Sequence, residues 1–271
     1  MKTFTLQEVG SGVWAAIAEP GGVAVGNAGF VDLGDQTLVF DTTISLTAGR
    51  GLRAAAERSG TLATVVYSHW HGDHVYGAGA MPADALVVAT ARTATLMEER
   101  GTERLRQLKE DPPTEGPFAE LADTEIPRLE LIYPDETFAA ERSFVGEERS
   151  AQAISYGGGH TLSDAFLWLG EEKILFAADL VVYGTHPWVG DGDVRAWPGI
   201  LERIAELGPE TIVPGHGPVA GPDAIDFMIG YLHDLSHAEP GSPAPDRYAS
   251  LANPNGWTRN VEAAAAQRVR S

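Results

Sequence analysis

The sequence of 271 residues contains no cysteine. Disulfide bonds, thiolate nucleophiles and thiolate-ligated metal sites are therefore excluded, and any zinc ion must be held by nitrogen and oxygen atoms. Long hydrophobic runs are missing too. No segment approaches the ~20 apolar residues that cross a bilayer, and the N-terminal residues lack the apolar stretch of a secretory signal. These absences predict a cytoplasmic protein without a membrane partner.

Positive charge is also scarce. The chain carries 19 Lys and Arg against 38 Asp and Glu, which gives a formal net charge of -19 at pH 7. A surface of this charge repels nucleic-acid phosphates and anionic lipids, so non-specific binding to either is disfavoured. We expect a small-molecule substrate and no nucleic-acid partner. The sequence leaves the oligomeric state open, a homodimer included.

Histidine, by contrast, is concentrated in one place. Residues 69–74 read His-Trp-His-Gly-Asp-His, so three imidazoles and a carboxylate share one short segment. Imidazole nitrogens suit zinc, iron, nickel and copper, and carboxylate oxygens suit harder divalent ions. A solvated loop has no need of this combination. The segment therefore indicates half of a centre for two metal ions.

The pattern of apolar runs predicts where this segment lies. We expect strands at 13–18, 28–33, 37–40, 64–67, 86–89, 151–156, 165–169, 173–177 and 211–213. We expect helices at 49–58, 93–110, 197–207, 222–237 and 261–270. Runs of strands with helices between them favour two face-to-face β-sheets covered by helices on both outer faces. No break in composition divides the chain, so we predict a single domain over 1–271, with a lid insertion at about 93–130 and a C-terminal extension at about 239–271.

Each candidate ligand follows the expected end of a strand, where open α/β sheets place their ligands. Beside the first segment, these are His160, Asp179 and His216. The proposed ligand set is His69, His71, Asp73, His74, His160, Asp179 and His216. His69, His71 and His160 would hold one ion, and Asp73, His74 and His216 a second. Asp179, as a carboxylate, would bridge both.

These motifs resemble those of the metallo-β-lactamase superfamily of metallohydrolases. The matching pieces are residues 38–41, 68–74, 159–161, 176–179 and 214–217, which occur in the family's order over roughly residues 12–219. The resemblance implies an αββα sandwich, a four-layer arrangement of two mixed sheets flanked by helices. It also implies a cofactor of two divalent ions, most often zinc, with manganese or iron as alternatives.

Differences within the motifs bear on the branch of the family. Penicillin-hydrolysing members of the cysteine type have Cys where this chain has Asp179, and Lys where it has Val182. The aspartate pattern is similar to that of lactonases and glyoxalase II-like thioesterases, rather than that of a typical β-lactamase. Tyr183 stands one position later than the catalytic tyrosine of lactonases. β-Lactam hydrolysis remains an alternative, as does persulfide or thiol oxidation at one iron held by two His and one Asp.

The expected reaction is hydrolysis of an ester, lactone, thioester or amide. A hydroxide that bridges the two ions would attack the carbonyl, and Asp73 would orient it and pass its proton on. Five further residues are candidates for supporting the ligands or lining the substrate pocket because of their positions near the motifs: Asp41, Asp164, Tyr183, His186 and Trp188.

Overall fold

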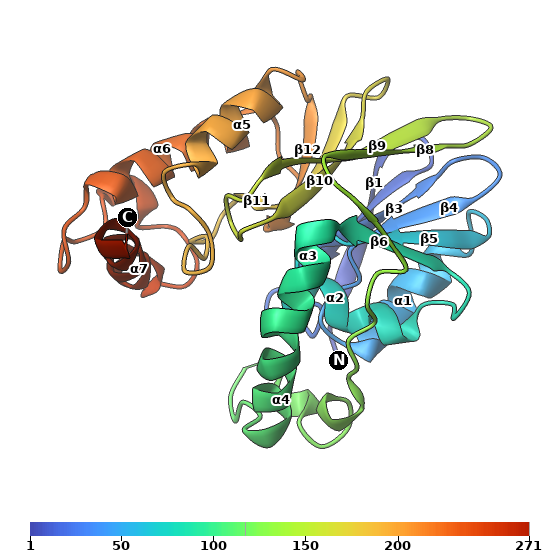
Figure 1. The fold of residues 1–271 in the computed structure, drawn as a ribbon, viewed down its shortest axis with the longest axis horizontal. Helices are drawn as coiled ribbons and strands as arrows, with labels where there is room; N and C mark the ends of the chain where they lie inside the picture. Colours follow the sequence, from blue (N-terminus) through green and yellow to red (C-terminus); the bar gives the residue numbers. More distant parts are fainter. Residues whose placement is uncertain (117, 271) are drawn as a thin grey trace.

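The computed structural model of the chain describes residues 1–116 and 118–270, and it contains two β-sheets that pack face to face (Figure 1). Among the described residues, the first sheet has seven strands that follow one another in space as in sequence: β1 (Phe4–Gly10), β2 (Val13–Ala18), β3 (Ala28–Asp32), β4 (Thr37–Phe40), β5 (Leu62–Val66), β6 (Leu86–Thr90) and β7 (Glu136–Phe138). Strands β1 to β4 pair antiparallel and β4 to β7 pair parallel, so the sheet is mixed.

The second sheet is mixed as well. Its five described strands lie in the order β12, β11, β10, β9, β8, with the bounds β8 (Glu141–Val145), β9 (Ser150–Gly157), β10 (Asp164–Leu169), β11 (Ile174–Val182) and β12 (Thr211–His216). Only β11 and β12 pair in parallel within this described part of the chain. The carboxyl end of β11, Val182, therefore lies beside the carboxyl end of β12, His216.

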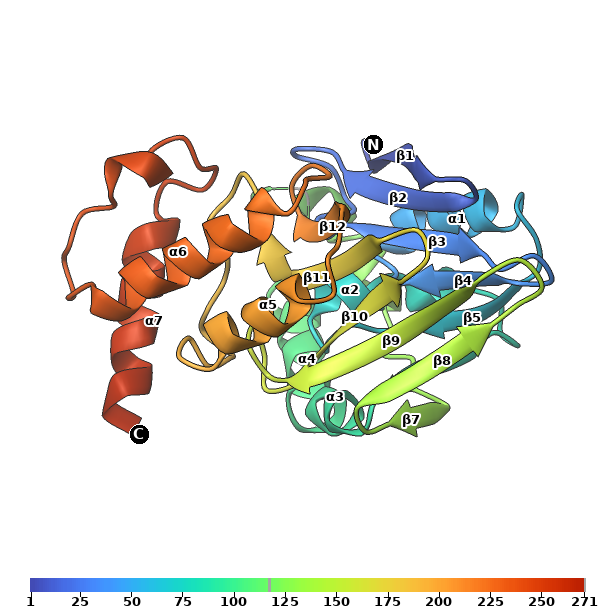
Figure 2. The ribbon, with the colours of Figure 1, turned by 90° about the horizontal axis from the view of Figure 1, so that it is seen from above.

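Helices cover the outer face of each sheet, as Figure 1 shows. Helix α1 (Leu46–Ala56) packs on β3 and β4, and α6 (Asp223–His237) packs on β11 and on α5 (Trp197–Ala205). The other α-helices are α2 (Gly72–Val75), α3 (Ala91–Leu96), α4 (Thr102–Glu110) and α7 (Gly256–Arg270). Figure 2 shows α7 crossing α6 at one end of the molecule. The expected four-layer αββα sandwich is confirmed. None of the described helices is long and apolar enough to span a membrane.

Three apolar clusters fill the three spaces between these four layers. Strand β10 shows how one strand serves two of them, because successive side chains on a strand point to opposite faces. Ala165, Leu167 and Leu169 face the first sheet, whereas Phe166 and Trp168 face the helices beyond the second sheet. All five side chains are buried. Continuous burial of this kind explains why the strand reads as an unbroken apolar run.

Three strands of the structure were not expected from the sequence. They are β1, β7 and β8, which lie at sheet edges. Their side chains are largely exposed: β8, for example, presents Glu141, Arg142 and Ser143 to solvent. An edge strand needs no apolar face on both sides, and charged residues there discourage pairing with another chain. Such strands therefore lack the apolar pattern on which the expectation relied.

Two helices differ from their expected bounds. Helix α1 begins at Leu46 instead of residue 49, because the Ser45 side chain accepts a hydrogen bond from the Ala48 backbone and caps the helix there. The helix expected over 93–110 is divided into α3 and α4 by a π-helical turn, Met97–Gly101. Short 3-10 helices complete the described structure at Tyr76–Ala80, Ala119–Leu121, Ile126–Arg128 and Asp246–Tyr248.

Candidate metal centre

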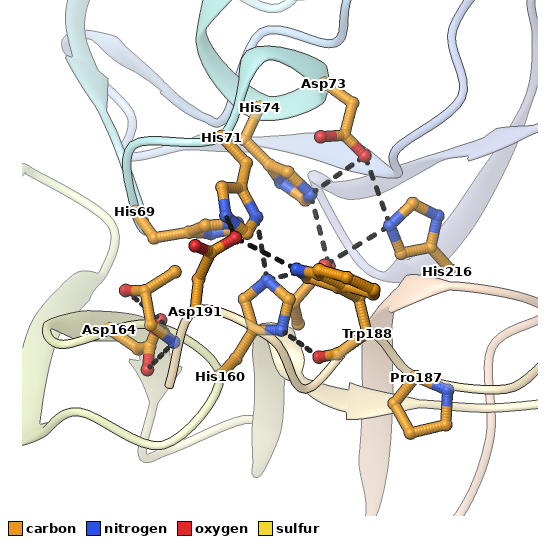
Figure 3. A network of polar contacts seen from close by, with 12 residues as sticks. His69, His71, Asp73, His74, His160, Asp164, Pro187, Trp188, Asp191 and His216 are labelled. Carbon is orange, nitrogen blue, oxygen red and sulfur yellow. Dashed lines mark hydrogen bonds and ion pairs between the residues drawn. The ribbon is translucent and has the colours of Figure 1, made fainter. Parts of the chain in front are cut away.

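All seven predicted ligands come together at one end of the sandwich, as Figure 3 shows for those that it labels. Their potential ligand atoms form two groups, and within each group these atoms all lie within 4.8 Å of one another. The first group is His69, His71, His160 and Asp179, and the second is Asp73, His74 and His216. Four separate segments of the chain contribute to this cluster. The division matches the one expected from sequence, with Asp179 in the first group.

The position of Asp179 corrects one expectation. We expected it just beyond a strand, but it lies inside β11, at a bulge where the register with β12 shifts. The preceding residue, Ala178, has a φ of 45°, an unusual value for a side chain with a Cβ. On the neighbouring strand, a Cβ on Gly215 would lie 1.9 Å from Asp179 Oδ1. The backbone thus approaches the carboxylate more closely than any side chain would allow.

The hydrogen bonds of His160 and His71 determine which of their nitrogens carry protons. His160 Nδ1 lies 3.0 Å from the Trp188 carbonyl, and His71 Nε2 lies 3.2 Å from Asp191 Oδ2. A carbonyl and a carboxylate can only accept, so both of these nitrogens are donors. When both rings are neutral, the opposite nitrogens, His160 Nε2 and His71 Nδ1, therefore present lone pairs, and they lie 2.9 Å apart. Two lone pairs at that distance repel each other unless a cation lies between or beside them.

A second network assigns His69 and His74 in the same way. Asp41 accepts hydrogen bonds from the Ser68 backbone (2.8 Å) and hydroxyl (2.7 Å), and its Oδ2 lies 2.7 Å from His74 Nδ1. Because the Ser68 hydroxyl donates to Asp41, it accepts from His69 Nδ1 at 2.8 Å. In the neutral imidazoles, the forms that bind metal, the Nε2 atoms of His69 and His74 are thus left as lone pairs. Both are buried without a hydrogen-bond partner among the described residues.

Asp179 connects the two groups of ligands. Its Oδ2 lies 3.2 Å from His160 Nε2 and 3.3 Å from His216 Nε2, and its Oδ1 lies 3.1 Å from His74 Nε2. Asp179 Oδ1 and His74 Nε2 are close enough for an ion pair, but they are not aligned as a hydrogen bond. Neither atom has a hydrogen-bond partner among the described residues. Asp73 Oδ2 lies 3.2 Å from His216 Nε2 and 3.7 Å from His74 Nε2. One carboxylate therefore faces imidazoles of both groups.

Electrostatics divides the imidazoles into two kinds. Burial lowers the pKa of His69 and of His160, because the charged form loses its hydration and neighbouring imidazoles repel it. Burial also opposes charge on His216, but the carboxylates of Asp179 and Asp73 outweigh it and raise the pKa of His216 to about 10. The same cluster holds the pKa of Asp179 well below its usual range despite burial, through His216 and His74. Neutral imidazoles and ionised carboxylates are the forms that bind metal, so His69, His160 and Asp179 are already in that form, whereas His216 would have to lose a proton when an ion binds.

This donor set fits a metal site. Lone pairs from imidazole nitrogens and carboxylate oxygens converge, and the hydrogen bonds that orient them come from outside the cluster, as is usual for metal-binding histidines. The absence of cysteine leaves only nitrogen and oxygen ligands, which zinc accepts in catalytic sites.

The comparison with known families decides the classification. Residues 21–216 match the family model described as the Metallo-beta-lactamase superfamily. The chain belongs to this superfamily. The family expected from the sequence motifs is therefore confirmed, and the matched region includes every residue of the metal cluster.

Individual relatives of this metallo-β-lactamase superfamily member are distant. It is 26% identical over 169 residues to the Metallo-beta-lactamase type 2 of Bacteroides fragilis, covering 60% of this chain and 56% of that protein. It is 27% identical over 155 residues to the Beta-lactamase-like protein 2 homolog of Caenorhabditis elegans, covering 57% of this chain and 42% of that protein. The chain thus spans about half the length of these curated relatives.

Solved structures share its fold. A metallo-beta-lactamase from Pontibacter korlensis superposes with a TM-score of 0.67 at 20% identity, covering 86% of this chain and all of that one. FIM-1 from Pseudomonas aeruginosa, solved in its mono-zinc form, gives a TM-score of 0.67 at 18% identity, covering 86% of this chain and 96% of that one. At these identities the likeness concerns the fold.

A cavity of about 900 Å³ opens onto the metal cluster of this superfamily member. Its walls come partly from the segment predicted as a lid, which contributes Arg104, Gln107, Leu108, Glu110, Asp111, Pro113 and Phe118. Val25 and Ile44 add apolar surface from the loops of the first sheet, and Arg259 reaches the cavity from α7. The C-terminal helix and the 93–130 segment thus face each other across the ligands.

The five residues predicted to support the site have different positions. Asp41 bonds Ser68 and His74, as described above. Asp164 accepts hydrogen bonds from the Gly159 and Thr161 backbones, so it shapes the loop that carries His160. Trp188 lines the cavity and its carbonyl accepts from His160. The structure does not bring the other two to the cavity: the Tyr183 hydroxyl donates to Asp223, and His186 pairs with Tyr231 beneath α6.

Two residues that contact the ligands were not singled out from sequence. Ser68 stands beside the first motif, and its hydroxyl connects Asp41 to His69. Asp191 lies in the loop between β11 and α5 and pairs with His71. A single aspartate between two glycines gives no periodic signal, although carboxylates that orient metal-bound imidazoles are a general expectation.

Proposed function

We propose that this protein is a dinuclear metal-dependent hydrolase of small carbonyl substrates: an ester, a lactone, a thioester or an amide. One observation carries the proposal. The ligand atoms of seven side chains form two adjoining groups, and Asp179 contacts imidazoles of both. His69, His71 and His160 would hold one ion, Asp73, His74 and His216 the other, and Asp179 would bridge them.

Two divalent ions, with zinc the favoured identity, would lower the pKa of a water molecule and polarise the substrate carbonyl when bound. The protein's own contribution centres on Asp73. One of its carboxylate oxygens faces His74 and His216, whereas Figure 3 draws no contact for the other. We infer that the second oxygen orients the attacking water and accepts its proton. The neighbouring imidazoles outweigh the burial of Asp73 and keep its pKa below the ordinary value, so the carboxylate is ionised and can accept a hydrogen bond from that water.

The cavity supports a small-molecule substrate. Its volume of about 900 Å³ is within the range of small-ligand sites. Apolar walls from Ile44, Leu108 and Phe118 would exclude water from the substrate, while polar residues line the cavity both at the metal cluster and on the 93–130 segment. A net charge of -19 disfavours nucleic acid as a substrate. The aspartate at position 179 supports the lactonase or thioesterase type. β-Lactams remain candidate substrates because a relative is named a metallo-beta-lactamase.

Oxidation of a persulfide or thiol at a single iron is the alternative of another class. It would use two imidazoles and one carboxylate. The second group of ligands would then have no metal to hold, although Asp41 orients His74 in it at 2.7 Å. The complete seven-residue set therefore favours hydrolysis.

A substrate panel tests the proposal directly. Zinc-loaded protein should hydrolyse at least one class among generic esters, lactones, thioesters and β-lactams. The variants His160→Ala and Asp73→Ala should lose turnover while they retain the fold. His233→Ala is the matched control, because His233 is an exposed histidine on α6, outside the cluster. Wild-type rates in either cluster variant would overturn the assignment.

A further inference from the structure

Helix α7 is bonded to the loop between β11 and α5 at two neighbouring points. Asn260 Nδ2 donates to the Pro187 carbonyl at 2.5 Å, and Gln267 Nε2 donates to the Val189 carbonyl at 2.7 Å. Gln267 Oε1 also accepts from the Val194 backbone at 3.2 Å. The two side chains thus bind the loop backbone on either side of residue 188. Both lie beyond the region matched by the family model, which ends at residue 216.

This loop between β11 and α5 also orients two of the imidazoles, those of His160 and His71. The carbonyl of Trp188 accepts from His160 Nδ1 at 3.0 Å, and Asp191 Oδ2 lies 3.2 Å from His71 Nε2. The Trp188 indole donates to the same Asp191 oxygen at 2.9 Å, as Figure 3 shows. Pro187, Trp188 and Asp191 therefore form one short path from α7 to the first group of ligands.

The loop between β11 and α5 has no regular structure of its own, and its other anchors are the Asp193 backbone, which donates to the Gly159 carbonyl at 3.0 Å, and the buried side chains of Val189 and Val194. Residues 186–196 contain no helix or strand, and glycines stand at positions 190 and 192, so the loop has many other conformations available to it. Side-chain amides from α7 replace the hydrogen bonds that a strand neighbour would supply. Asn260 is fully buried and also donates to the Tyr231 hydroxyl at 3.0 Å, which ties α6 into the same arrangement.

We propose that Asn260 and Gln267 are positioning residues of the metal centre: by fixing the backbone of Pro187 and Val189, they hold the Trp188 carbonyl and the Asp191 carboxylate where these orient His160 and His71. The proposal rests on the metal site of the proposed function. It makes the C-terminal helix part of the site, although α7 supplies no ligand. It also predicts different effects on the two ions, because the contacts reach the first group of ligands and do not involve Asp73, His74 or His216.

Gln267→Glu is the sharpest variant, because it changes one atom and keeps the size of the side chain. The carboxylate still accepts from Val194, but it places an oxygen against the Val189 carbonyl, where the amide donated. Gln267→Ala removes both bonds of Gln267, and Asn260→Ala removes the hydrogen bond to the Pro187 carbonyl. Glu262→Gln is the matched control, since Glu262 is exposed on the same helix.

The measurement is zinc affinity for each ion, by competition with a chromophoric chelator, using the full-length protein. Removing a hydrogen bond that orients a metal ligand commonly weakens metal binding 10- to 100-fold. We expect Gln267→Glu and Asn260→Ala to lower the affinity for one of the two zinc ions by about tenfold and to leave the affinity for the other unchanged. The control Glu262→Gln should bind both ions with wild-type affinity. Cobalt substitution identifies the ion that changes, because its absorption reports the geometry of the ligands.

Other results would overturn the positioning role. If the Gln267 and Asn260 variants melt at lower temperature but bind both ions as the wild type does, α7 only stabilises the fold. Equal weakening of both ions would likewise contradict the selective path through Trp188 and Asp191. Affinity is measured without turnover, so a wild type that binds zinc but hydrolyses no substrate would refute the proposed function alone. A wild type that binds no zinc would refute both.

Discussion

Oδ2 of Asp41 lies 2.7 Å from Nδ1 of His74, and both side chains are almost wholly buried. Asp41 also accepts hydrogen bonds from the backbone N–H and the hydroxyl of Ser68, and that hydroxyl in turn orients His69. One carboxylate thus sets the direction of an imidazole in each group of ligands. Asp41 has a φ of 60°, a conformation that Asp and Asn tolerate better than most residues.

Asp41→Asn should weaken zinc binding by about 10- to 100-fold with little change in backbone strain. An amide placed with its nitrogen toward His74 would move the ring proton to Nε2 and block the ligand. Placed the other way, it would set an N–H against the Ser68 backbone N–H. Zinc affinity by chelator competition measures the effect. Asp84→Asn, at an exposed aspartate, is the control, and equal affinities in the two variants would contradict the role given to Asp41.

Gly215→Ala should disturb the bridging carboxylate. The added Cβ would lie 1.9 Å from Asp179 Oδ1, so Asp179 must move away from the position where it faces both groups of ligands. We expect loss of at least one metal ion per chain, measured by elemental analysis after gel filtration. Gly199→Ala is the control because nothing lies within 4 Å of its added Cβ and alanine favours a helix. Full metal content in Gly215→Ala would show that Asp179 does not bridge.

Glu125 provides a pH-dependent contribution to stability away from the metal. It accepts from the Thr47 backbone at 3.0 Å and from Arg50 at 2.9 Å, at the N-terminus of α1. Burial opposes its charge, but these bonds outweigh burial and lower the pKa of Glu125. Its stabilisation is therefore complete above the unfolded-state pKa of about 4.3, and it is lost as pH falls through the lower pKa of the folded state.

Glu125→Gln should accordingly reduce the free energy of unfolding by about 1–2 kcal/mol at pH 7. The difference from wild type should shrink below about pH 4 and approach zero once the wild-type carboxyl is protonated. Urea unfolding at several pH values measures it, with Glu120→Gln, at an exposed glutamate, as the control. A difference that stays constant down to pH 3 would mean that Glu125 does not act through its charge.

The sequence was most informative where chemistry and spacing coincide. Residues 69–74 indicated a metal site because few other uses explain so many imidazoles together. His160 and His216 were found from their positions at expected strand ends, whereas Asp179 was found by the same argument but lies inside β11. The sandwich followed from buried strands such as β10, whose apolar runs are unbroken. Both signals are local, so a single sequence carries them.

Contacts between distant segments were not predictable in the same way. Asp191 meets His71 across 120 residues, and Asn260 meets Pro187 across 73, with no periodic pattern at either end. Helix α7 begins at Gly256 instead of the expected 261, because Trp257 stacks on Tyr248, a tertiary contact that overrides weak local helix propensity. Such contacts depend on the finished packing, which no local signal describes.

The most direct test of the account is the metal content per chain, by elemental analysis of protein purified without added metal. The account predicts close to two equivalents of zinc, or of manganese, because two groups of ligands adjoin and Asp179 faces both. About one equivalent of iron, or no bound metal at all, would contradict it. The iron result would direct the next assay to oxygen uptake with persulfides.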